Sequence, residues 1–68
     1  MKLIERDWNE YLGQYENTWL ADNEDDIAAD FDPEGAIGSM IIVIATENVF
    51  IKNTEGKWQK SGTNEVIE

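Results

Sequence analysis

The sequence predicts an α+β fold, with one or two N-terminal helices packed on a three- to four-stranded antiparallel β-meander. Three patterns favour this class: helical spacing of large apolar residues near the N-terminus, an uninterrupted apolar run at 40–45, and a hairpin signal at 53–56. A chain of 68 residues suffices for one domain, so we expect a single domain over 1–68. Cysteine and histidine are both absent, which excludes disulfides and the usual zinc sites.

Residues 3–20 are expected to form an amphipathic helix. Large apolar side chains recur there three or four positions apart and fall within an arc of about 100° on a period of 3.6 residues. Gly13, Asn17 and Thr18 are poor helix formers, so the helix would depend on tertiary packing and could end near Asn17. We interpret the stripe as core rather than as a ligand groove. Its members are Ile4, Trp8, Tyr11, Leu12, Tyr15 and Trp19.

Residues 23–32 are expected to be a short acidic helix or an acidic loop. For the helix, Asp22 or Asn23 would be the N-cap, and the acids that follow would complement the helix dipole in its first turn. The segment 32–35, Asp-Pro-Glu-Gly, suits a type I turn that ends it. The alternative is an extended loop pinned to the core by Ile27 and Phe31.

A β-meander is expected over 39–60. The run 40–45 is rich in β-branched residues and of strand length, and 49–52 and 57–60 are the next two strands. The segment 53–56, Asn-Thr-Glu-Gly, predicts a type I turn with Gly56 in the left-handed conformation. Residues 61–68 remain open between a tail and an edge strand. The predicted core comprises Trp8, Leu12, Tyr15, Trp19, Phe31, Ile41, Val43, Ile51 and Trp58.

The negative charge is concentrated in the first half of the chain. The net charge is −10, from fifteen acids and five bases, and only Arg6 is basic between Glu5 and Glu34. Such a field repels nucleic acid and membranes and attracts basic proteins. A purely solubilising role is the alternative, although it gives no reason to leave the second half almost neutral. The acids of the first half are Glu5, Asp7, Glu10, Glu16, Asp22, Glu24, Asp25, Asp26, Asp30, Asp32 and Glu34.

Catalytic and metal sites are weakly indicated. Without His or Cys the usual nucleophilic triads cannot be built, and no glycine-rich phosphate-binding motif is present, so we expect no enzyme and no cofactor. Asp22, Glu24, Asp26 and Asp30 occupy positions 1, 3, 5 and 9 of an EF-hand-like loop. The required glycine and bidentate glutamate are missing, which leaves only weak divalent-metal binding as an alternative.

The eleven acids therefore predict a surface that binds a basic partner. Duplex DNA carries about one negative charge per 1.7 Å of its axis, and a compact acidic domain can offer a comparable array to a DNA-binding cleft. We expect a DNA mimic that binds the basic, nucleic-acid-binding surface of another protein, without direct contact to nucleic acid or membrane. The main alternative is a small structural or assembly module, with a possible homodimer, that involves no mimicry.

Part of the second half resembles short proteins encoded by phages and prophages. The resemblance rests on a Gly-Ser-hydrophobic segment (38–42), an aromatic strand (49–52) and Glu-Gly-Lys-Trp-Gln (55–59), about twenty residues in all. In size and charge the chain is also similar to phage DNA mimics such as uracil-DNA glycosylase inhibitors and anti-restriction proteins, a likeness of class without an aligned motif. The resemblance implies a host-directed inhibitor in the cytoplasm of an infected or lysogenic bacterium, with no catalytic residues to carry over.

Overall fold

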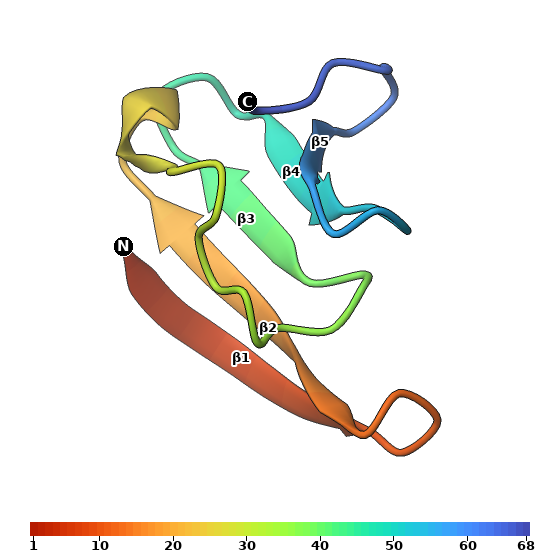
Figure 1. The fold of residues 1–68 in the computed structure, drawn as a ribbon. Coiled ribbons are helices and arrows are strands. Elements are labelled where there is room, and N and C mark those ends of the chain that lie inside the picture. The colour runs from red at the N-terminus through yellow and green to blue at the C-terminus, as the bar shows by residue number, and fades with distance from the viewer.

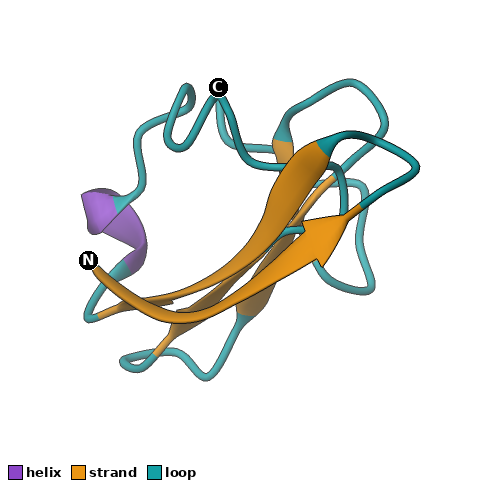
Figure 2. Ribbon diagram, turned by 90° about the horizontal axis from the view of Figure 1, so that it is seen from below, coloured by secondary structure: helices purple, strands orange, loops and turns teal.

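The computed structural model describes all 68 residues and contains one five-stranded mixed sheet (Figure 1). The strands lie side by side in chain order: β1 (Lys2–Asn9), β2 (Gln14–Ala21), β3 (Met40–Val43), β4 (Val49–Lys52) and β5 (Trp58–Lys60). The one helical element is a single 3₁₀ turn, η1 (Glu24–Asp26), which Figure 2 shows beside the strands. The fold is therefore all-β, and the predicted α+β class is wrong.

The predicted helix over 3–20 is an antiparallel hairpin of β1 and β2. Trp8 pairs with Tyr15 and Leu3 with Trp19, with a bulge between Leu3 and Glu5. The turn is closed by a hydrogen bond from Gly13 N to Asn9 O of 2.9 Å, and Gly13 has a φ of +64°, which glycine adopts freely. Aromatic and β-branched residues favour strands. The three-residue spacings among the apolar residues of 3–20 occur only where these residues are counted through the turn. Within each strand the spacing is four, which also fits the two-residue alternation of a β-strand.

Residues 22–39 form the connection between β2 and β3, which pair in parallel. Parallel pairing requires the chain to cross back over the sheet, and in Figure 1 this segment passes in front of β2. Within it the structure places only the η1 turn, followed by further turns, so the loop alternative for 23–32 describes it better than a helix of two turns.

The second half of the chain contains the antiparallel order β3-β4-β5 that the sequence predicts for 39–60. Gly56 has a φ of +78° and donates a hydrogen bond of 2.9 Å to Asn53 O, as the hairpin signal indicates. After β5 a single bridge joins Val66 to Gln59, and Ile67 packs against the core.

All buried sheet residues point to one face, which we call the covered face because the connection lies over it. The core consists of Ala21, Ile27, Ile41, Val43, Phe50 and Trp58, with Trp19 and Phe31 partly buried against it. The opposite side, the open face, has no buried residue. Four predicted core residues are exposed because the hairpin extends beyond the connection or because they point to the open face: Trp8, Leu12, Tyr15 and Ile51.

Candidate functional site

The connection is fixed to the sheet by the Asp32 side chain. One carboxylate oxygen, Oδ2, accepts hydrogen bonds from Asn17 Nδ2 and from Trp19 Nε1, each 3.0 Å long. The Phe31 ring packs edge to face on Trp19 at 4.9 Å, and Trp58 Nε1 donates to Phe31 O at 2.9 Å. The connection is thus tied to both β2 and β5.

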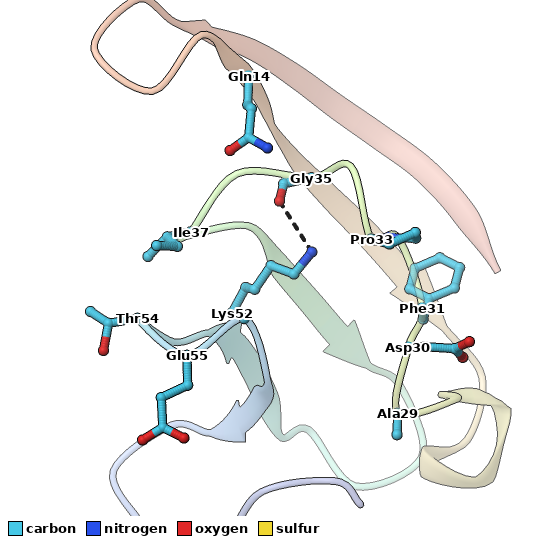
Figure 3. A pocket seen from close by; sticks show the side chains of 11 residues that line it. Gln14, Ala29, Asp30, Phe31, Pro33, Gly35, Ile37, Lys52, Thr54 and Glu55 are labelled. Atoms are coloured by element: carbon cyan, nitrogen blue, oxygen red, sulfur yellow. Dashed lines mark hydrogen bonds between the residues drawn. The ribbon is translucent and has the colours of Figure 1, made fainter.

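Lys52 fixes the same segment from β4. Its side chain is 5% exposed, and its ammonium group donates to Asp32 O and, at 3.1 Å, to Gly35 O (Figure 3). Lys52 lines a surface cleft of about 520 Å³, with Asp30 and Phe31 from the connection and Glu55 from the β4–β5 turn. The ammonium charge is satisfied by backbone carbonyls, so Lys52 serves the fold and does not neutralise the surface acids.

The structure divides the eleven acids between the two sides of the sheet. Glu5, Asp7 and Glu16 lie on the open face, where Asp7 and Glu16 are direct cross-strand neighbours. Glu10 lies in the β1–β2 turn. The other seven belong to the connection: Asp22, Glu24, Asp25, Asp26, Asp30, Asp32 and Glu34. They therefore do not form one surface: four belong to the β1–β2 hairpin, and seven belong to the connection, which crosses the sheet from β2 and is tied to β5.

None of these eleven carboxylates forms an ion pair. The one salt bridge of the molecule joins Lys60 to Glu65 at 3.8 Å, in the second half of the chain. Lys52 is buried, and the Arg6 guanidinium lies 3.6 Å from the centroid of the Tyr15 ring. Three of the five bases thus have internal partners, and the negative field of the first half is left uncompensated.

Three of the predicted partner-binding acids accept hydrogen bonds inside the fold: Asp32, Glu24 and Asp26. Besides Asp32, Glu24 Oε1 accepts hydrogen bonds from Asn48 Nδ2 at 2.6 Å and from Thr46 Oγ1 at 3.1 Å. The Asn48 amide, and after it the Thr46 hydroxyl, lower the pKa of Glu24 from its usual value. The donors to Asp32 and Glu24 come from 13 to 24 positions away, so the local sequence contained no signal for these roles.

The EF-hand-like spacing does not produce a metal site. No group of three or more acidic side chains comes together in a geometry that could hold a metal ion. Asp26 instead accepts a hydrogen bond from the Asn23 backbone N–H at 3.2 Å, inside the η1 turn. The alternative of a weak divalent site at Asp22–Asp30 therefore loses its geometric basis.

The exposed aromatic residues of the hairpin line a second cleft of about 560 Å³ between the hairpin and the connection. Trp8 is 57% exposed and meets Tyr15 edge to face at 4.9 Å. Asn17 also lines this cleft, and its Oδ1 has no hydrogen-bond partner. That atom is shielded from solvent, and the cleft is lined besides by the charged residues Arg6 and Glu34.

Apolar side chains from three adjacent strands meet on the open face. Leu20, Ile42 and Val49 are aligned across β2, β3 and β4, and Met40 and Ile51 are aligned beside them. This patch was not predicted, because residues 3–20 were expected to be a helix and not strands that place Leu20 beside Ile42. The alternation of Glu16, Thr18 and Leu20 with buried neighbours could have revealed it.

No family model, curated protein or solved structure matches this chain. The structure contains no helix with the length and apolar character needed to cross a membrane. The radius of gyration is 11.1 Å, which is typical of a folded chain of this length.

Proposed function

We propose that this protein is a binding domain without catalytic activity, which engages the basic, nucleic-acid-binding surface of another protein as a DNA mimic. The observation that supports the proposal is the uncompensated charge: none of the eleven acids between Glu5 and Glu34 has a basic partner. A surface that kept its charge for internal stability would pair those groups. Unpaired carboxylates instead steer and bind a positively charged partner.

Rigidity is the second property that mimicry requires. The two eight-residue strands of the hairpin pair at seven positions, and the connection is tied down through Asp32, Lys52 and Trp58. Carboxylates held on such a framework lose little conformational entropy when a partner binds. In the setting that the resemblance implies, the partner is a protein of a bacterial host and binding takes place in the host cytoplasm.

Salt dependence and competition by DNA test this proposal. The immobilised protein is incubated with bacterial lysate at low salt, retained proteins are eluted with a salt step, and these are identified by mass spectrometry. The principal retained protein is then purified and titrated at several salt concentrations with and without duplex DNA. We expect affinity to fall steeply with salt, and DNA to displace the domain. Retention of ribosomal proteins alone, or binding indifferent to DNA, would contradict mimicry.

Self-association is a second candidate, because β1 is an eight-residue edge strand with one side unpaired and the open face carries an apolar patch on β2, β3 and β4. Exposed strand edges and apolar sheet faces are common dimer contacts. Sedimentation velocity over a hundredfold concentration range distinguishes the two functions. A dimer unaffected by salt and by neutralised carboxylates would favour the assembly module.

A further inference from the structure

The apolar patch of the open face spans the middle of the sheet. It comprises Leu20 on β2, Met40 and Ile42 on β3, and Val49 and Ile51 on β4. Met40 and Ile51 are each 36% exposed, and Leu20, Ile42 and Val49 are half-buried. Neighbouring strands are about 4.8 Å apart, so three strands present a strip about 10 Å wide. That width matches the diameter of an α-helix with its side chains, about 10–12 Å.

Carboxylates border this patch on one side only. Glu5, Asp7 and Glu16 share the open face on β1 and β2, where Thr18 separates Glu5 from Met40 and the Asp7–Glu16 pair lies one step further along the strands. Lys2, opposite Leu20, is the one basic residue that the β1–β2 register adds to the face. An apolar strip with an acidic flank complements a segment with an apolar stripe and a basic flank.

We propose that the open face binds a cationic amphipathic helix of the partner protein. Its apolar stripe lies on the Leu20–Ile42–Val49 patch, and its lysines or arginines lie over Glu5, Asp7 and Glu16. The inference rests on the proposed function and names the face and the partner chemistry. A second copy of this chain fits less well, because it also carries a charge of −10 and brings further carboxylates to the contact.

The probe is a synthetic 18-residue helical peptide of leucine and lysine, with an apolar stripe and a lysine flank. A scrambled peptide of the same composition has the same charge but no stripe. Binding is measured by calorimetry, and the contact is mapped by amide chemical shifts of the labelled full chain. We expect the striped peptide to bind about tenfold tighter than the scrambled one, a difference of about 1.4 kcal/mol. Its shifts should concentrate on β2, β3 and β4.

Two triple variants with equal charge change test the acidic flank. The first, Glu5→Gln with Asp7→Asn and Glu16→Gln, neutralises the open face. The second, Asp25→Asn with Asp30→Asn and Glu34→Gln, neutralises three exposed acids of the connection. We expect about a tenfold loss for the first and less than about threefold for the second, because screened charges act over about one Debye length. Equal losses would overturn the assignment of the face.

A matched pair of apolar variants tests the patch itself. Met40→Ser with Ile51→Ser removes two exposed members, whereas Leu12→Ser with Ile37→Ser removes residues of similar exposure outside the sheet strands. We expect about a tenfold loss in the first pair and less than about twofold in the second. Equal affinity of the scrambled and striped peptides would overturn the inference. So would changes in the open-face amide shifts when the protein alone is concentrated, because they would show that a second copy of the chain binds this face.

The proposed function and this inference fail in different measurements. If capture remains salt-sensitive and competed by DNA while the open-face variants bind normally, the function stands and the face is wrong. If the striped peptide binds the open face but DNA does not displace the captured protein, the face stands and the mimicry is wrong.

Discussion

Replacing Asp32 by alanine should remove the main tie between the connection and β2. The carboxylate accepts hydrogen bonds from Asn17 Nδ2, on a side chain that is 9% exposed, and from the half-buried Trp19 Nε1. Hydrogen bonds to charged groups contribute about 1.5–3 kcal/mol, and we take about 1 kcal/mol for each here because Asp32 is partly exposed. Asp32 also has a φ of +50°, where alanine costs about 1–2 kcal/mol.

The expected loss is therefore about 3–4 kcal/mol in the free energy of unfolding. A domain of this length has a stability of about 3–10 kcal/mol, so Asp32→Ala removes a large part of it. Asp32→Asn keeps an oxygen acceptor and tolerates the left-handed backbone, so it should lose only about 1 kcal/mol. Gly35→Ala should weaken the same tie from the other side, because its new Cβ would overlap the Asp32 carboxylate.

Urea denaturation followed by tryptophan fluorescence measures these losses. The matched control is Asp30→Ala, which removes an exposed acid from the same connection and should change stability by less than about 0.5 kcal/mol. If Asp32→Ala stays within about 1 kcal/mol of the parent, or Asp30→Ala matches it, the tie assigned to Asp32 is wrong.

Three further predictions concern groups that the covered face holds in place. Lys52→Met leaves two carbonyls without their donor and should cost about 1–3 kcal/mol in a urea melt, whereas the exposed Lys57→Met should be nearly neutral. Trp58→Ala empties a fully buried position and should cost about 3–5 kcal/mol, which calorimetry would show as a strongly lowered Tm. Because the pKa of Glu24 is lower in the folded chain than its unfolded value near 4.5, the ionised carboxylate stabilises the fold at any pH above 4.5. This stabilisation is lost as the pH falls through the lower pKa of the folded chain. The Tm of the parent should therefore exceed that of Glu24→Gln at pH 6, and the two Tm values should converge as the pH falls to 3. A difference in Tm that stays constant with pH would contradict the stabilising role of the Glu24 carboxylate.

The hairpin shows why the first half was predicted wrongly. Trp8, Tyr15 and Trp19 fit a helical arc, but Tyr15, Asn17 and Trp19 also alternate with Glu16 and Thr18 in a strand period. The sequence therefore contains both a helical and a strand period, and the helical period appears only if the residues are counted through the turn that contains Gly13. Pairing with β3 decides between them, because a strand there buries Ala21 against Val43 at the sheet centre.

The second half was predictable because its signals are local. A β-branched run, a four-residue turn and the conformational freedom of Gly56 act within a few positions, and the strands and hairpin they predict are present. The candidate site was predictable only as a set of acids. Which of them serve the fold, as Asp32 and Glu24 do, depends on donors brought from distant parts of the chain.

By itself, the amino-acid sequence determined the negative charge, its concentration before Glu34, and the meander from β3 to β5, because composition and short-range turn geometry do not depend on the rest of the fold. Tertiary structure alone decided that the first half is a hairpin, that β2 and β3 run parallel, and that the acids divide between two faces. The physical reason is that burial selects among local conformations of similar energy, and burial is known only once distant segments have met.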